Sequence, residues 1–331
     1  MSFVVTPLPR RTEMTIKTTP KRAFTECHGW SEAFTGSFRA DFRCNGRKPA
    51  PRGVRVPTTS QSPPEDFLFE LYLAAIWFSM KSLHFQPYAG LADALGRADL
   101  SGRSVLITGG GHGIGFNVAK SFAEHGVGRI LLVADLASED DINRIFESLE
   151  FSPDILVNNA GYMPTPEPFL SANMSEYWSG FTINVLGTAL LTQAYVRHRL
   201  EHGATPAVVI TLNTAGAYGP SVPNLSAYLA SKAALARWVE TVSADIDHQV
   251  ARFISVHPGA VDTDMLAKSQ LGGAFPSTEG KLVGDSIVWT ATEEAKFLAG
   301  RFVWANWDVQ KLLSLRDDIL SKNLFVTSLA E

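Results

Sequence analysis

A glycine-rich turn that follows an apolar run is the feature that most constrains what this chain can fold into. Residues 104–108, Ser-Val-Leu-Ile-Thr, have the continuous apolar character of a buried parallel strand. Residues 109–115 read Gly-Gly-Gly-His-Gly-Ile-Gly, and a helix is predicted from about residue 113 to residue 125. Glycines let the backbone turn sharply and approach a bound group, and the free N–H groups at a helix start favour a phosphate. The context favours a pyrophosphate site over an ordinary tight turn, and the predicted contact residues are Thr108, Gly109, His112, Gly113, Ile114 and Gly115.

Strand-like and helix-like segments alternate along the chain from residue 103 onward. This alternation predicts an α/β fold with a doubly wound, Rossmann-like parallel sheet, whose ligand lies at the carboxyl ends of the strands. We expect a single domain over residues 83–331. The predicted strands are 104–108, 129–134, 154–157, 207–212, 252–257 and 301–305, and the predicted helices are 113–125, 139–149, 176–200, 228–247 and 309–321.

Further short motifs follow the glycine turn. They are Asn158-Asn159-Ala160-Gly161, Asn184 within Ile-Asn-Val, Tyr228 and Lys232 four residues apart, and Pro258-Gly259 followed by Thr263. Together with the Thr-Gly-X-X-X-Gly-X-Gly spacing of the turn, these motifs resemble the short-chain dehydrogenase/reductase family. The resemblance covers about residues 83–331, and residues 300–309 look like fungal members of that family.

The resemblance implies an enzyme that interconverts an alcohol and a ketone or aldehyde by hydride transfer with NAD or NADP. In the family, the residue that matches Tyr228 passes a proton to or from the substrate oxygen. The match to Lys232 holds the nicotinamide ribose, and the match to Asn184 anchors a water in the proton relay. The four-residue step puts Tyr228 and Lys232 on one helix face, where a cation is expected to favour the phenolate. The other cofactor-binding residues implied are Asn159, Ala160, Gly161, Pro258, Gly259 and Thr263, and no metal is expected.

One implied catalytic residue is missing. The family usually has a serine after its fifth strand, where this chain has Asn213, and Thr214 carries the nearest hydroxyl. Either side chain can donate a hydrogen bond to a carbonyl oxygen, so both are candidate catalytic residues. The alternative is a catalytically impaired nucleotide-binding protein of the same fold, in which Asn213 caps the strand.

The segment between the glycine turn and Asn158 is shorter than the family pattern. Only one predicted strand and one predicted helix lie there, so a strand–helix unit of roughly 25 residues is missing. Asp135 has two interpretations. It could bind the adenosine ribose, as in an NAD enzyme, or it could match the family's third strand, whose Asp touches adenine. The choice between NAD and NADP therefore stays open.

The amino-terminal region differs in composition from the rest of the chain. Residues 1–60 contain 11 Lys or Arg and 4 Asp or Glu, whereas the whole chain contains 29 and 33, so the folded part is acidic. An acidic domain argues against nucleic-acid binding. Residues 1–65 are rich in Pro, Ser, Thr and Arg without an apolar period, which predicts a disordered basic extension.

Residues 66–82 form an apolar helix or linker that is too short for the ~20 residues of a membrane span. No membrane span is therefore expected, and residues 1–79 could be an extension that the native protein, beginning at Met80, lacks. Cys27, His28 and Cys44 are too few and too widely spaced for structural zinc. We expect a cytoplasmic protein, and the basic amino terminus makes a mitochondrial location the alternative.

The loop from Thr263 to about Gly284 is expected to form a flexible lid over the substrate, facing a wall from Ala217 to Leu225. An apolar pocket there suits a small hydrophobic alcohol or ketone, although the same residues could be plain core. A homo-oligomer is expected by family analogy alone. The predicted pocket residues are Tyr162, Met163, Tyr218, Met265, Leu266 and Phe275.

Overall fold

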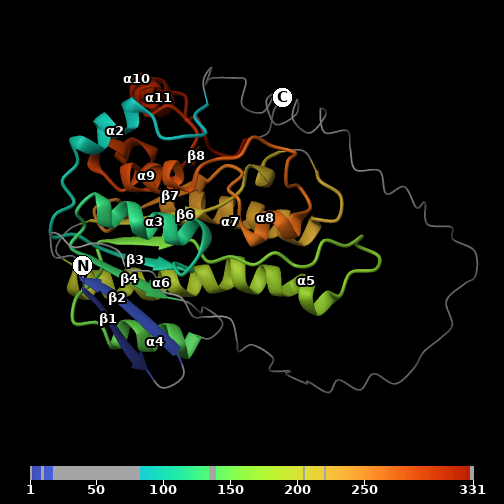
Figure 1. Ribbon diagram of the computed structural model, residues 1–331, viewed down its shortest axis with the longest axis horizontal. Helices are drawn as coiled ribbons and strands as arrows, with labels where there is room; N and C mark the ends of the chain where they lie inside the picture. The colour runs from blue at the N-terminus through green and yellow to red at the C-terminus, as the bar shows by residue number, and fades with distance from the viewer. Residues whose placement is uncertain are drawn as a thin grey trace, which may run out of the picture.

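The computed structural model describes residues 2–8, 11–17, 83–133, 139–203, 206–219 and 221–328. Six parallel strands form the body of one sheet, in the order β4-β3-β5-β6-β7-β8 (Figure 1). The order reverses between β3 and β5, and the carboxyl ends of the strands at such a point bind ligands in doubly wound sheets. The predicted fold is therefore confirmed. The strands are β3 (Ser104–Thr108), β4 (Arg129–Val133), β5 (Ile155–Asn158), β6 (Ala207–Leu212), β7 (Ala251–His257) and β8 (Phe302–Trp304).

A hairpin of residues 2–8 and 11–17 extends this sheet, and the disorder predicted for residues 1–65 stays a prediction. Strands β1 (Ser2–Leu8) and β2 (Arg11–Lys17) pair antiparallel, and β2 pairs antiparallel with β4. Because the described residues contain no further parallel strand beside β4, its outer edge would otherwise expose unpaired N–H and C=O groups, which accept another strand readily. Residues 18–82, including Cys27, His28, Cys44 and the apolar run, lie outside the described residues.

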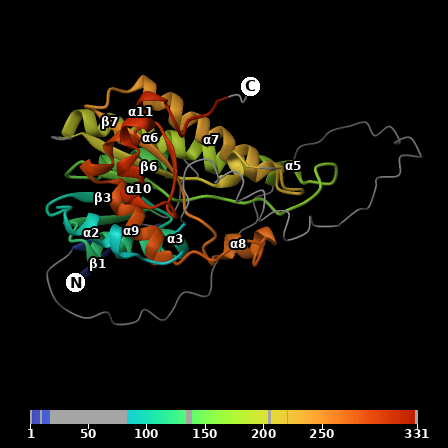
Figure 2. The same cartoon turned by 90° about the horizontal axis from the view of Figure 1, so that it is seen from above.

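Helices cover both faces of the sheet (Figures 1 and 2). Helices α2 (Ala89–Gly96), α3 (Gly113–Glu124) and α9 (Gly280–Thr290) pack on one face, and α4 (Glu139–Glu147), α6 (Thr188–His202) and α7 (Ser226–Asp245) pack on the other. Helix α3 follows the glycine turn, and α7 carries the Tyr-X-X-X-Lys motif. The two layers therefore bring the two motifs to the same edge of the sheet.

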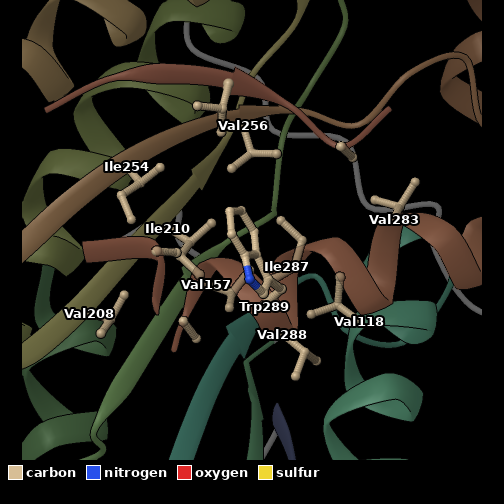
Figure 3. Close-up of a cluster of buried hydrophobic side chains, with 14 of the residues drawn as sticks. Val118, Val157, Val208, Ile210, Ile254, Val256, Val283, Ile287, Val288 and Trp289 are labelled. Carbon is tan, nitrogen blue, oxygen red and sulfur yellow. The ribbon is translucent and has the colours of Figure 1, made fainter. Parts of the chain in front are cut away.

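The apolar strand residues of the first face pack directly on α9. Figure 3 shows Ile210, Ile254 and Val256 of the sheet gathered around Trp289 and Val288 of α9, and all five are buried. Burying side chains of this size contributes on the order of 1.5–3 kcal/mol each. This packing holds the sheet in place against α9, and the strands of this sheet end at the candidate site.

Shorter elements complete the fold. The single helix predicted for residues 176–200 is three joined segments with a π-helical middle, and the helix predicted for 309–321 is broken into two. These elements are α5 (Met174–Phe181), η1 (Thr182–Gly187), η2 (Ala215–Ala217), α8 (Asp264–Ser269), η3 (Glu293–Leu298), α10 (Val309–Ser314) and α11 (Arg316–Ser321).

No helix in the described ranges is long and apolar enough to cross a membrane.

An ion pair fixes the amino-terminal ends of β3 and β5, opposite the site. Asp154 accepts hydrogen bonds from the backbone N–H and hydroxyl of Ser104, both at 2.8 Å. The Arg199 guanidinium of α6 donates to Asp154 Oδ1 at 3.1 Å and to the Ser152 carbonyl at 3.0 Å. Arg199 is buried, so these acceptors replace the water that would otherwise stabilise its positive charge.

We expect Asp154→Ala to lower the free energy of unfolding by about 3 kcal/mol, because it removes a carboxylate from a buried cation. Urea denaturation measures this change. The control is Glu201→Ala on α6, the helix that carries Arg199, where the side chain is 72% exposed and the expected change lies within about 0.5 kcal/mol. Equal effects of the two substitutions would show that Asp154 does not hold the strand ends.

Candidate active site

Two side chains join the carboxyl ends of β3 and β5. The Thr108 hydroxyl accepts the backbone N–H groups of Asn159 and Ala160 at 3.0 and 2.9 Å. The Asn159 amide donates to the carbonyls of Thr108 and Gly109 at 2.8 and 3.0 Å. The glycine turn and the Asn-Asn-Ala-Gly motif are thereby held together.

The backbone of the glycine turn requires glycine at several positions. Gly109 and Gly113 have φ angles of +63° and +56°, which favour glycine. A Cβ on Gly115 would lie 2.5 Å from Asn159 Nδ2 and would also meet the Gly109 carbonyl, so α3 can start this close to β5 only with glycine there. Among the described residues the His112 side chain makes no capping hydrogen bond, so the first N–H groups of α3 can face an anion.

Asn184 lies in the π-helix η1 and is fully buried. Its Oδ1 accepts the Tyr162 backbone N–H at 2.7 Å, and its Nδ2 donates to the Tyr162 carbonyl and the Ser231 hydroxyl, both at 2.9 Å. Ser231 in turn donates to the Tyr228 carbonyl at 2.7 Å. Isolated π turns are frequent at functional sites. Here the π turn connects Asn184 to both the loop after β5 and the helix that carries Tyr228.

Tyr228 and Lys232 lie on α7, and the Lys232 Nζ donates to the Leu212 carbonyl at the end of β6 at 3.0 Å. Burial raises the pKa of Tyr228 to about 12 and lowers the pKa of Lys232 to about 8. The expected lowering of the phenol pKa by the cation is therefore wrong for this geometry. Burial disfavours both charged forms, and Lys232 makes its hydrogen bond with the strand end.

The structure separates the two candidates for the missing serine. Asn213 is buried, its Nδ2 donates to Ser255 at 3.2 Å, and its Oδ1 accepts the Thr214 backbone N–H at 2.8 Å. The oxygen and the nitrogen of its side-chain amide are therefore both hydrogen-bonded within the protein. The Thr214 hydroxyl accepts the Gly216 N–H at 3.3 Å and keeps its own hydrogen to donate. Both residues line the cavity described below.

The Pro258-Gly259 turn and helix α8 lie beside the glycine turn. Gly259 has a φ of +82°, and a Cβ there would lie 2.6 Å from Asn306 Oδ1. Thr263 caps α8, and its methyl group lies 3.4 Å from the Cβ position of Gly113. Lys268 of α8 donates to the Met163 carbonyl at 2.7 Å. Helix α8, in the segment predicted to form a lid, therefore lies against the glycine turn and the loop after β5.

A cavity of about 650 Å³ lies at this end of the sheet and brings some of these residues together. Tyr228, Thr214, Asn213, Ile114 and Thr263 line it. Of the residues predicted for an apolar pocket, Met163, Tyr218, Met265, Leu266 and Phe275 line it, whereas Tyr162 does not. The predicted site residues that are outside its lining are Thr108, Gly109, His112, Gly113, Gly115, Asn159, Ala160, Gly161, Asn184 and Lys232.

Asp135 lies outside the described residues, so the structure does not decide between its two interpretations. The described residues contain no group of three or more His, Cys, Asp or Glu side chains that could hold a metal ion.

The far wall of the cavity comes from residues that the sequence analysis did not place in the site. Thr327 donates from its backbone N–H and its hydroxyl to Glu240 Oε1 at 2.8 and 2.7 Å, and Tyr218 donates to the same oxygen at 2.9 Å. The Glu240 side chain is only 7% exposed. In the sequence, only the aromatic residues within 302–307 could have indicated that this segment lines a cavity. The wall consists of His257, Phe302, Trp304, Trp307 and residues 324–328.

Comparisons with known proteins identify the family. The family described as enoyl-(acyl carrier protein) reductase, adh_short_C2, matches residues 102–283. The short chain dehydrogenase/reductase nsrO of Aspergillus novofumigatus (strain IBT 16806) is 30% identical over 277 residues, which cover 75% of this chain and 94% of that protein. The chain belongs to the short-chain dehydrogenase/reductase family. It is therefore an oxidoreductase.

Other members are similar over comparable lengths. The short chain dehydrogenase citE of Monascus ruber is 29% identical over 66% of this chain and 86% of its own length. A 3-oxoacyl-[acyl-carrier protein] reductase from Brucella melitensis, solved in complex with NAD, has a TM-score of 0.56 and 23% identity, and covers 64% of this chain and 97% of that chain. A short chain dehydrogenase from Shigella flexneri, complexed with NADP, has a TM-score of 0.57 and 20% identity, and covers 62% of this chain and 98% of that chain. The two structures share the fold.

His257 makes stability depend on pH. Burial lowers its pKa to about 3, below the ordinary value of 6.5, so the folded state binds fewer protons than the unfolded state between these values. The stabilisation by neutral His257 is complete above about pH 6.5 and is lost as the pH falls. We expect this residue alone to lower the free energy of unfolding by about 2 kcal/mol between about pH 7.5 and about pH 5.

Urea denaturation of the parent protein and of His257→Phe at the two pH values measures this loss. The variant should lose about 2 kcal/mol less than the parent. The same loss in both proteins would place the acid sensitivity elsewhere.

Proposed function

We propose that this enzyme interconverts a small apolar alcohol and its ketone or aldehyde, with NAD or NADP as the hydride carrier. The observation that carries the proposal is the shared cavity, which Tyr228 and Thr214 line together with Ile114 of the glycine turn and with residues of the Pro-Gly turn and of the loop after it. Family membership supplies the reaction type. Since Asp135 lies outside the described residues, the proposal covers both cofactors.

The residues that would hold the cofactor fit it. The left-handed glycines and the N–H groups at the start of α3, which no side chain of the described residues caps, suit the pyrophosphate. When bound, the nicotinamide would donate a hydride to the substrate carbon or accept one from it. The residues assigned to the cofactor are Thr108, Gly109, His112, Gly113, Ile114, Gly115, Asn159, Ala160, Gly161, Lys232, Pro258, Gly259 and Thr263.

Tyr228 is the proposed proton donor and acceptor. With a pKa of about 12 the phenol is neutral near pH 7, so in the reducing direction it can give its proton to the developing alkoxide. Lys232, with a pKa of about 8, remains largely protonated there and can stabilise the phenolate that forms. Asn184 positions this part of α7 through Ser231. Thr214 is assigned to the substrate carbonyl oxygen, because the Asn213 amide bonds within the fold.

A second candidate function is a catalytically impaired nucleotide-binding protein. The observation that favours it is that the Asn213 amide bonds to Ser255 and Thr214 rather than being free for substrate. Turnover of any alcohol or carbonyl compound separates the two candidates. The predicted homo-oligomer stays a prediction, and the exposed apolar side chains Phe169, Leu170, Met174 and Trp178 are compatible with a subunit contact.

We expect Tyr228→Phe to reduce kcat by about a hundredfold to ten-thousandfold with unchanged cofactor affinity, because the substitution removes the acidic proton and keeps the ring. Lys232→Ala should impair both quantities. Steady-state rates with a reducible carbonyl compound and titration with NADH or NADPH measure them. Tyr177→Phe, outside the cavity, is the matched control and should keep the parent rate. If Tyr228→Phe retains most of that rate, the assigned mechanism is wrong.

We expect Thr214→Val to reduce kcat by about a hundredfold, because it deletes the proposed donor to the carbonyl oxygen and keeps the shape of the side chain. Asn213→Ala should instead lower the melting temperature, since it leaves buried hydrogen-bonding groups without a partner. Kinetics and thermal unfolding of both variants measure the contrast. A larger kcat loss for Asn213→Ala than for Thr214→Val would reverse the assignment.

A further inference from the structure

The cavity offers no partner to a charged ligand in the part of the chain that the structure describes. Its described lining contains no Lys, Arg, Asp or Glu, and most of it is apolar. The titratable side chains in that lining are Tyr218, Tyr228 and His257. Burial raises the pKa of both tyrosines to about 12 and lowers the pKa of His257 to about 3, so all three are neutral near pH 7. A buried charge without a partner is costly, so the cavity favours an uncharged ligand.

The far wall of the cavity is attached to α7 at a distance from Tyr228. Thr327 and Tyr218, which both line the cavity, donate hydrogen bonds to Glu240 at 2.7 and 2.9 Å. Glu240 follows Tyr228 on the same helix, and the helical rise places their Cα atoms about 18 Å apart along the axis. A ligand that reacts at Tyr228 therefore needs a chain to approach this wall.

Residues 324–328, called the closing segment below, are fixed in an unusual conformation. Phe325 has a φ of +66°, which a bulky side chain rarely adopts. Its carbonyl accepts the Phe302 N–H of β8 at 2.9 Å, and its ring centroid lies 4.7 Å from that of Trp307. Backbone strain of this kind persists only where surrounding contacts enforce it, and it is frequent at ligand sites. The closing segment is therefore held by β8 on one side and by Glu240 of α7 on the other.

We propose that the substrate is an uncharged ketone or alcohol with an apolar chain on its reacting carbon, and that Phe325 and Val326 contact the end of that chain. Both residues line the cavity. The inference rests on the proposed function for the position of the reacting carbon. It adds the direction of the chain and the residues that exclude a charged chain end. Phe325 and Val326 determine specificity and take no part in proton transfer.

Two probes of equal length test the proposal. They are methyl heptyl ketone and 8-oxononanoate, in which a carboxylate replaces the terminal methyl group. A chain of nine atoms extends about 10 Å, as three extended residues do, so its end lies short of Glu240. Isothermal titration calorimetry of the full-length parent protein at about pH 7 should show the ketone binding about a hundredfold more tightly than the anion. Saturating oxidised NAD or NADP is present, so that no ketone is reduced during the titration.

Two substitutions in the closing segment should change this preference in different ways. Phe325→Ala should weaken the binding of methyl heptyl ketone by about tenfold and that of methyl ethyl ketone by less than about twofold, because the shorter chain does not reach the closing segment. Val326→Arg should bind 8-oxononanoate at least about tenfold more tightly than the parent does, because a guanidinium pairs with a carboxylate. The control is Lys322→Ala, outside the described lining with a side chain 61% exposed, which should match the parent for all three probes.

Three results would overturn the proposal. The first is equal affinity of the parent for methyl heptyl ketone and 8-oxononanoate. The second is an equal loss of the long and the short ketone in Phe325→Ala, which would indicate a structural role alone. The third is unchanged binding of 8-oxononanoate by Val326→Arg. This variant keeps the Phe325 ring on Trp307, so it tests the proposal even if thermal unfolding shows that Phe325→Ala does not fold.

Turnover with NADH or NADPH distinguishes this proposal from the proposed function. Reduction of methyl ethyl ketone by the parent, without a preference between the two longer probes, would overturn the chain site and leave the proposed reaction intact. A preference for methyl heptyl ketone that Phe325→Ala lowers, without turnover of any probe, would support the chain site and contradict the proposed reaction on these ketones.

Discussion

The hydrogen bonds between Thr108 and Asn159 are the constraint on which the rest of the site depends. They join the ends of two strands whose connections leave in opposite directions, at the point where a doubly wound sheet opens a crevice. Because Asn159 also bonds the Gly109 carbonyl, the same side chain fixes the first residue of the glycine turn. The direction of α3 follows from this contact. A small displacement at this junction would change both the glycine turn and the loop that carries Met163.

The site is arranged as a series of strand ends. Each step across the sheet contributes a different chemical group: the glycine turn after β3, the Asn-Asn-Ala-Gly loop after β5, Thr214 after β6, His257 at the end of β7 and Trp304 at the end of β8. The spacing of strands is set by backbone hydrogen bonds and hardly varies. Side chains at the ends of these strands are therefore a fixed distance apart. The identity of each side chain determines which part of a ligand can lie next to it.

Much of this could be predicted from the sequence, because the relevant signals are local. The glycine turn, the strand periodicity and the four-residue step from Tyr228 to Lys232 each depend on neighbouring residues. Three features could not be predicted, because they depend on contacts between distant segments. The sequence does not show that the Asn213 amide reaches Ser255, that the Lys232 ammonium reaches the Leu212 carbonyl, or that burial outweighs the cation in setting the pKa of Tyr228. The cavity wall at residues 324–328 is about 100 residues from Tyr228 and has no periodic pattern.

Glu240 joins the cavity wall at residues 324–328 to the helix that carries Tyr228. One of its carboxylate oxygens accepts hydrogen bonds from Thr327 and Tyr218, and Glu240 lies on α7 with Tyr228. The same segment is also attached to the core, because the Phe325 carbonyl accepts the Phe302 N–H at 2.9 Å and the Phe325 ring packs on Trp307. A substitution in residues 324–328 therefore changes the shape of the cavity and the packing around β8 together, so this wall does not vary independently of the sheet.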